Sequence, residues 1–306
     1  MNFTELYFII ISAVAFGYVL AAVLVETKFV NWLGLKTLRL SRFGIHPLLT
    51  NVPVIYLVSP RAAHVVASEL LKEGKIEAVD LYLAILASNF PMRLMFLYRY
   101  YLPVLLPLIG AVAVYYALLR LAFDIVVLAT VSIIGRLRYR KLHFEYPKYE
   151  SVKVEVNLKV LKEGVLKGLK EAALFTVKFT PLFLLVVFLI KEGAMEWLTN
   201  KLGPYFGALG FDSLEITYIT TAAISPPVAY GLIKVMLARN YAVTHILGTM
   251  AVGNAMFSLL RSWWAYLLPY YLGLYPIRIT TMLLLLQAGL PIVYNFSVGV
   301  LLVKVF

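Results

Sequence analysis

The chain has 306 residues, of which 62% are hydrophobic and only 14% are charged, and its mean hydropathy is +0.85. This composition excludes an ordinary soluble domain and indicates an all-α, polytopic membrane protein. The net charge of +12 does not indicate a nucleic-acid partner, because Lys and Arg concentrate in short stretches beside apolar segments, where they set topology. The lack of cysteine excludes disulfides and thiolate metal sites.

Hydrophobic runs long enough to cross a bilayer recur along the chain. The first span is predicted over 6–25, and residues 28–42 mix apolar and basic side chains as an amphipathic helix at the membrane interface does. Residues 43–58 and 61–74 are each too short or too polar to span alone, and Ser59-Pro60 separates them. We therefore expect these two arms to form a re-entrant hairpin. Spans over 76–98 and 111–135 follow, joined by a connector rich in Tyr and Pro.

The only extended polar segment covers 136–157 and is predicted to be a basic cytoplasmic linker. It separates a first repeat over 1–135 from a second over 158–306. The second repeat opens with another interfacial helix, starting at Leu158, and then follows the order of the first. Its predicted elements are a span over 171–191, hairpin arms over 209–224 and 227–239 separated by Ser225-Pro226, and spans over 243–262 and 279–303.

The two halves match in register as well as in order. At an offset of 166, Gly44 pairs with Gly210 and Ser59-Pro60 with Ser225-Pro226, while an offset of 165 pairs Asn89 with Asn254. Each half has three crossings and a hairpin, and an odd number of crossings places the halves in opposite orientations. The predicted fold is therefore an inverted-repeat, transporter-like core.

The charge distribution gives the orientation. With both termini outside, the cytoplasmic segments hold eighteen Lys and Arg residues and the outer segments hold six, among them Arg93 and Arg99. This bias follows the positive-inside rule. The predicted location is the cell membrane, with multiple crossings.

The two Ser-Pro breaks carry the functional hypothesis. A helix broken within hydrocarbon exposes backbone groups that must be satisfied, so paired breaks indicate a cavity. Proline suits the first turn of a helix, and the serine before it can cap the free N–H groups. We expect Ser59 and Ser225 to begin the second arms, whose positive helix ends would attract an anionic or carbonyl oxygen near the midplane.

Candidate binding residues lie around the breaks or alone within a span. They are Ser59, Asn89, Glu215, Thr220, Thr221, Ser225, Asn254 and Lys178. Structural alternatives remain open at this point. Ser and Thr can bond back to their own helices, an asparagine can join two helices, and Lys178 can pair with an acidic group or extend toward the interface. For Arg120 and Asp124, four residues apart on one helical face, mutual neutralisation is the leading interpretation and a role in transport is the alternative. No catalytic residue, metal site or cofactor is predicted.

The stretches Gly164 to Leu169, Lys178 to Pro181 and Ser225 to Gly231 resemble the Gate or nucleoside-recognition domain family of membrane proteins. The first half is similar to a more diverged copy. Members of that family are similar to the core of concentrative nucleoside transporters and to the membrane domain of the ferrous-iron uptake protein. The resemblance implies an inverted-repeat transporter or permease.

The leading hypothesis is a transporter or permease for a small polar or anionic solute, with nucleoside-like solutes included, bound between the two hairpin tips. Coupling to protons or sodium would use threonine, asparagine and backbone oxygens. The alternatives are a membrane scaffold that binds a partner protein through the 136–157 linker and, third, a ferrous-iron permease. Expected partners are the substrate and the lipid bilayer, with a second copy of the chain or another membrane protein left open.

Overall fold

The computed structural model describes residues 44–57, 60–139, 156–192 and 194–305, with residue 154 and scattered positions between 7 and 27. The regular secondary structure of these residues is helical, as predicted. Four helices among them are long and apolar enough to cross a membrane: Ala78–Ile109, Ala111–Tyr139, Val243–Trp264 and Ile277–Val305. Their length and composition suggest membrane association.

The first half begins with a pair of short helices. After the 3-10 turn η2 (Pro47–Leu49) come α3 (Val52–Tyr56) and α4 (Pro60–Lys72), which we call the first helix pair. The next helical run is built from α5 (Ala78–Ala87), α6 (Asn89–Phe96), the π-helical segment η3 (Leu97–Leu105) and α7 (Leu106–Ile109), and α8 (Ala111–Tyr139) completes this half.

The connector expected after residue 98 is itself helical, so that prediction was wrong. The wider turns of η3 contain Pro103, and a π segment accommodates a residue that would break regular α-helical bonding. The chain reverses only at Gly110, whose φ of +57° suits glycine. Arg93, which the charge count assigned to the outer side, lies near the middle of the resulting 32-residue helical run Ala78–Ile109.

The second half opens with one long helix. Helix α9 (Leu158–Lys191) runs without interruption through the predicted interfacial helix and the predicted span, so their separation was also wrong. After α10 (Ala194–Ala208), the second helix pair consists of α11 (Ser213–Ile224) and α12 (Pro226–Ala238). The remaining elements are α13 (Val243–Phe257), the π segment η4 (Ser258–Leu267), α14 (Leu268–Leu272), α15 (Ile277–Leu284), the π segment η5 (Leu285–Gly289) and α16 (Leu290–Val305).

Element lengths recur between the halves. Helices α4 and α12 each have 13 residues and begin 166 positions apart. Helix α8 and the run from α15 to α16 each have 29 residues and also begin 166 positions apart. Between these two elements, each half has a long helical run that contains a π segment, which is η3 in the first half and η4 in the second. The lengths and starting positions of these helices therefore recur at an offset of 166 residues.

Two glycines with positive φ mark corresponding turns. Gly44 (φ +78°) and Gly210 (φ +96°) precede the two helix pairs. A Cβ on Gly44 would lie 2.8 Å from the carbonyl oxygen of Ser132, and one on Gly210 would lie 3.4 Å from a methyl group of Val303. Each turn thus packs against the last long helix of its own half.

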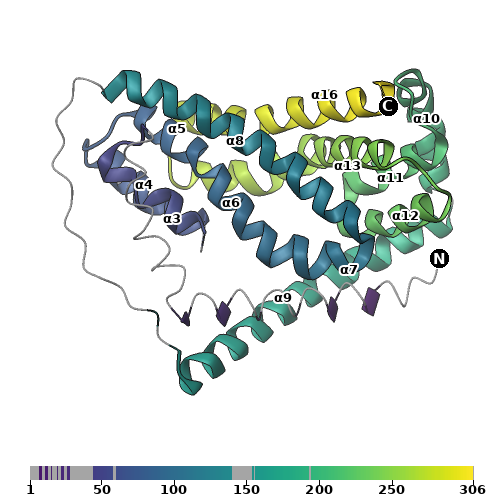
Figure 1. Cartoon of the computed structure of the whole chain (residues 1–306), viewed down its shortest axis with the longest axis horizontal. Helices are drawn as coiled ribbons and strands as arrows, with labels where there is room; N and C mark the ends of the chain where they lie inside the picture. Colours follow the sequence, from purple (N-terminus) through teal and green to yellow (C-terminus); the bar gives the residue numbers. More distant parts are fainter. Residues whose placement is uncertain are drawn as a thin grey trace.

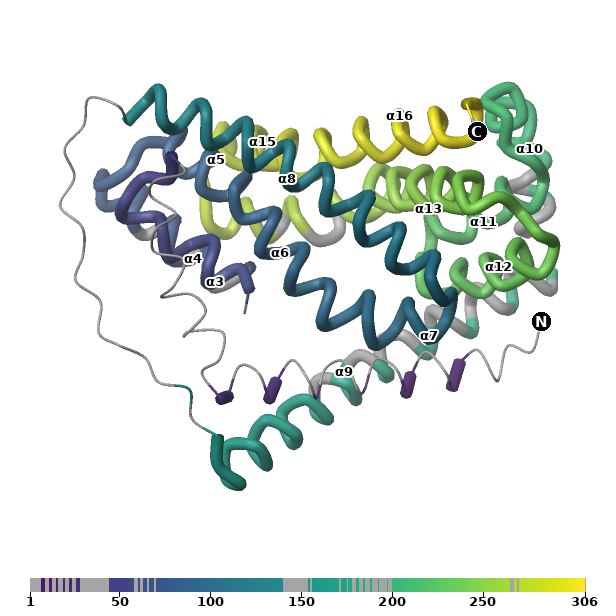
Figure 2. Tube along the Cα trace, viewed as in Figure 1, coloured from purple at the N-terminus to yellow at the C-terminus, as the bar shows by residue number. Residues whose placement is uncertain are grey.

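The helix pairs lie at opposite ends of the molecule, and the long helices connect them (Figure 1). Each pair contacts residues of the other half. His64 of α4 hydrogen-bonds the hydroxyl of Tyr275 at 3.0 Å, while Tyr230 of α12 contacts the ring of Tyr100 at 6.4 Å. His64 and Tyr230 are 166 positions apart, so matching positions of the two pairs each contact the other half. Figure 2 shows the long helices running along the molecule between the two pairs.

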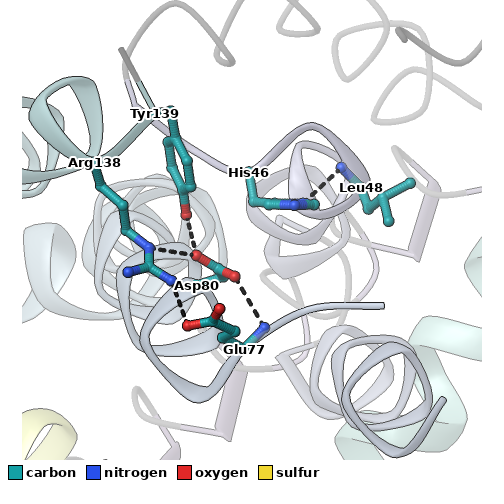
Figure 3. A network of polar contacts seen from close by, with 6 residues as sticks. All are labelled: His46, Leu48, Glu77, Asp80, Arg138 and Tyr139. Carbon is teal, nitrogen blue, oxygen red and sulfur yellow. Dashed lines mark hydrogen bonds and ion pairs between the residues drawn. The ribbon is translucent and has the colours of Figure 1, made fainter. Parts of the chain in front are cut away.

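A polar network joins the end of α8 to the start of α5 (Figure 3). The guanidinium of Arg138 donates to Asp80 at 2.9 Å and to Glu77 at 2.7 Å, and the hydroxyl of Tyr139 donates to Asp80 at 2.5 Å. Asp80 and Glu77 also form the capping box of α5. Burial lowers the pKa of the adjacent His46 below its ordinary value, against the opposing effect of Asp80. The network fixes where these two long helices meet.

Candidate functional site

A pocket of about 380 Å³ lies between the two halves of the chain. Helix α6, segment η3 and helix α8 of the first half supply one wall, and α12 and α13 of the second half supply the other. We call it the central pocket. Among the residues that line it are Arg93, Tyr101, Tyr116, Arg120, Pro226, Tyr230 and Asn254.

The polar residues of the central pocket fall near the middle of long helices. Arg93 is the sixteenth residue of the 32-residue helical run Ala78–Ile109, Arg120 is the tenth of the 29 in Ala111–Tyr139, and Asn254 is the twelfth of the 22 in Val243–Trp264. Charges at such positions are costly in a bilayer and are kept where they serve substrates or ions. The partners of each of these groups therefore decide between a structural and a functional role.

Arg93 is neutralised by a specific partner. Its Nε lies 2.7 Å from Oδ2 of Asp124, and the two side chains are only 10% and 1% exposed. Another of its nitrogens donates to the Tyr101 hydroxyl at 3.4 Å. The prediction that Arg120 and Asp124 neutralise each other was wrong, because the continuous helix from Ala78 to Ile109 brings Arg93 to the aspartate instead.

Arg120 is held differently and keeps unused hydrogen-bonding capacity. The residue is 7% exposed, and one of its terminal nitrogens donates to the side-chain oxygen of Asn295 on α16. Its Nε has no hydrogen-bond partner among the described residues. A guanidinium offers donors in a planar fork that matches a carboxylate or a phosphate. Asp124 neutralises Arg93, so the charge of Arg120 gives the central pocket a net positive charge.

Ser225 forms the junction of the second helix pair, with extended backbone angles (φ −149°, ψ 96°). The predicted side-chain cap was wrong. Its hydroxyl, in a residue only 2% exposed, has no partner among the described residues. The start of α12 also differs from the expected anion site, because Pro226 and Pro227 carry no N–H and the amides of Val228 and Ala229 both donate to the Ser225 carbonyl. Positive charge in the central pocket therefore comes mainly from arginine.

Side chains from the π segments donate hydrogen bonds to carbonyls at the end of the first helix of each pair. At the end of α11, the Ile224 carbonyl accepts a hydrogen bond from Arg261 of η4 at 2.9 Å. At the end of α3, the Leu57 carbonyl accepts one from the Tyr98 hydroxyl of η3 at 2.6 Å. Carbonyls at a helix end lack partners within the helix, so these side chains satisfy groups that would be costly in an apolar surrounding.

The sequence-predicted residues have different surroundings. Asn254 lines the central pocket, and Ser225 directly precedes the prolines that line it. Asn89 is buried one turn before Arg93, and its Oδ1 has no partner in the described part of the chain. Ser59 lies outside the described residues. Lys178 belongs to α9, but its side chain is also outside them.

Three of the predicted residues are engaged elsewhere. The hydroxyls of Thr220 and Thr221 both bond back to the Thr217 carbonyl, at 3.0 and 2.7 Å, which is the structural alternative. Glu215, only 1% exposed, lies at the start of α11, at the opposite end of that helix from Ser225. The structure does not bring these side chains to the central pocket.

Glu215 organises a separate polar cluster. Its carboxylate accepts hydrogen bonds from the Asp212 amide at 2.9 Å and the Thr249 hydroxyl at 3.1 Å, and it lies 3.1 Å from Nδ1 of His245. Nearby, a hydrogen bond to Asp212 raises the pKa of Tyr241 to about 12. The cluster caps α11 and joins it to α13. In the described part of the chain, no group of three or more His, Asp or Glu side chains is placed to hold a metal ion.

Sequence reasoning did not include Arg93, Arg120 or the tyrosines of the central pocket among the site candidates. Arg93 lies within the predicted span over 76–98, but the charge count assigned it to the outer side. The apolar character of residues 94–97 and 104–109 was the signal that the helix continues beyond it.

Comparison with known proteins gives relatives but no assigned activity. The chain is 25% identical over 276 residues to the uncharacterized protein MJ0871 of Methanocaldococcus jannaschii, covering 86% of this chain and 83% of that protein. It is 22% identical over 285 residues to the uncharacterized protein MJ1556 of the same organism, covering 90% and 87%. No family model and no solved structure matches the chain.

Proposed function

We propose that the protein is the core of a multi-pass membrane transporter or permease that binds a small anionic solute in the central pocket. The observation that carries the proposal is Arg120, a buried guanidinium whose Nε lacks a partner among the described residues and which lines a pocket between the halves of the chain. An anion there would satisfy this group, and the bound solute would contact both halves.

The location of the pocket supports transport in particular. In inverted-repeat transporters, substrate binds near the bilayer midplane between the repeats, and one repeat moves against the other to alternate access. Here Pro226 and Tyr230 of the second helix pair face Arg93 and Arg120 of the first half across the pocket. The recurring element order and the inverted topology predicted from charge fit this mechanism.

Anion binding to the purified full chain tests the proposal. Thermal unfolding is measured with inorganic phosphate, citrate, adenosine monophosphate and uridine, since the last is a nucleoside without a charge. A ligand at 100 times its dissociation constant stabilises a protein by about 2.7 kcal/mol, which is a readily measured rise in Tm. We expect at least one of the anions to stabilise the protein more than uridine does.

Matched variants assign the effect to the pocket. Arg120→Gln keeps an amide that can bond Asn295 but removes the charge, so it should abolish the anion-induced rise in Tm. Arg239→Gln removes the same charge from an exposed residue at the end of α12 and should leave that rise intact. Equal effects of the two variants, or stabilisation only by a co-purifying protein, would favour the scaffold hypothesis instead.

A further inference from the structure

An apolar groove of about 280 Å³ adjoins the central pocket. It runs between η3 and α7 on one side and α8 on the other, and its lining is apolar except for Arg93 and Tyr101. The same two residues also line the central pocket. A cationic pocket and an apolar groove therefore share a wall formed by these side chains.

The groove lies on a surface that a bilayer would cover. Leu102 and Leu118, which line it from η3 and α8, are 47% and 55% exposed, and Leu106 and Val114 beside them are also exposed. Both walls belong to helices long and apolar enough to cross a membrane. A hydrocarbon chain from the bilayer could enter the groove sideways without meeting water.

The central pocket offers a charged group and the adjoining groove offers apolar contacts, which matches the charged head and the hydrocarbon chain of an amphiphile. The guanidinium of Arg120 has an unused donor in the central pocket, and the groove offers only apolar contacts once past Arg93 and Tyr101. A soluble anion such as citrate would use the pocket and leave the groove empty. A hydrocarbon chain that carries a phosphate or carboxylate would use both.

We infer that the substrate is an anionic amphiphile, with its head group at Arg120 in the central pocket and its hydrocarbon chain in the groove between η3–α7 and α8. The inference rests on the proposed function, because it names the substrate class of the same site. It also implies that substrate reaches the pocket laterally from the membrane and not through an aqueous path.

Binding of ethyl phosphate and decyl phosphate to the full chain in lipid nanodiscs tests this. Each methylene removed from water tightens binding about fourfold, although part of that gain also accompanies partition into the bilayer. The informative comparison is therefore between proteins that face the same bilayer. Leu118→Trp fills the groove, and Ile125→Trp, two turns further along the exposed face of α8, is the matched control outside it.

We expect Leu118→Trp to weaken decyl phosphate binding at least tenfold while ethyl phosphate changes less than twofold, and Ile125→Trp to change neither. Leu118→Gln, which introduces a polar group without bulk, should act in the same direction as Leu118→Trp. If both groove variants bind decyl phosphate as the unmodified chain does, the amphiphile inference is overturned while the anion site stands. If Arg120→Gln alters neither ligand, the proposed function fails as well.

Discussion

At the scale of single residues, the candidate site depends on two arginines that have different tasks. The charge of Arg93 is neutralised by Asp124, whereas Nε of Arg120 has no hydrogen-bond partner among the described residues. The sequence predicted a polar site between the halves that includes Asn254, and Asn254 lines the central pocket. It could not assign the arginine partners, because these pairs join residues 31 and 175 positions apart and depend on which helices pack together.

The Arg93–Asp124 pair should behave as a buried ion pair. Arg93→Leu leaves the Asp124 charge without its partner, so we expect it to lower the free energy of unfolding by about 3–5 kcal/mol. The double variant Arg93→Leu, Asp124→Leu removes both charges and should recover most of that loss. Unfolding in mixed micelles measures both. Equal destabilisation by the single and double variants would show that the pair is not energetically coupled.

A substitution at Ser225 should affect ligand binding without lowering the free energy of unfolding. Its hydroxyl makes no hydrogen bond to the described residues, and an unsatisfied buried hydroxyl costs about 1–3 kcal/mol. Ser225→Ala should therefore leave the free energy of unfolding unchanged or raise it, while weakening ligand binding in the central pocket. Thr249→Val is the contrasting variant, because the Thr249 hydroxyl donates to Glu215 and its loss should destabilise. A clear loss of stability in Ser225→Ala would contradict a ligand-binding role.

At the scale of helices, the prediction of the elements succeeded where local pattern decides and failed where packing decides. The Ser-Pro break gave the start of α12, since proline fixes the first turn. The end of the helical run Ala78–Ile109 was placed too early, because Pro103 normally ends a helix and only tertiary packing sustains a π segment around it. Helix α9 was predicted as two elements, because its first part is charged and its second part is apolar.

Close packing of α13 on α16 provides a test at this scale. A Cβ on Gly248 would lie 2.7 Å from the carbonyl oxygen of Gly299. Helices α13 and α16 could therefore not pack this closely if Gly248 were a larger residue. We expect Gly248→Ala to destabilise the protein by about 1–3 kcal/mol. Gly207→Ala in α10 meets no atom within 4 Å and should be neutral or stabilising by up to about 1 kcal/mol. Similar unfolding curves for the two variants would argue against this helix contact.

At the scale of the whole molecule, the two helix pairs lie at opposite ends of the structure (Figure 1). The register between the halves was visible in the sequence, but the exchange of contacts between each helix pair and the other half was not, because it depends on how long helices cross. His64 and Tyr230, at matching positions, show that exchange. The inverted sense of the repeat is a prediction from charge, and it can be tested directly.

Single cysteines test the topology, since the chain has none of its own. Lys75 and Arg239 are exposed residues at corresponding turns, after α4 and after α12. A membrane-impermeant maleimide should label Arg239→Cys in intact cells and Lys75→Cys only after permeabilisation, because inverted halves present the two turns to opposite faces. Labelling of both from the same face would rule out the inverted arrangement.

The location of a bound anion tests the central claim most directly. Crystals of the full chain grown with 8-bromooctyl phosphate would place the phosphate from its density and the bromine from its anomalous signal. We predict the phosphate within hydrogen-bonding distance of Arg120 Nε in the central pocket. A central pocket without density, or a phosphate bound only at the molecular surface, would contradict the account.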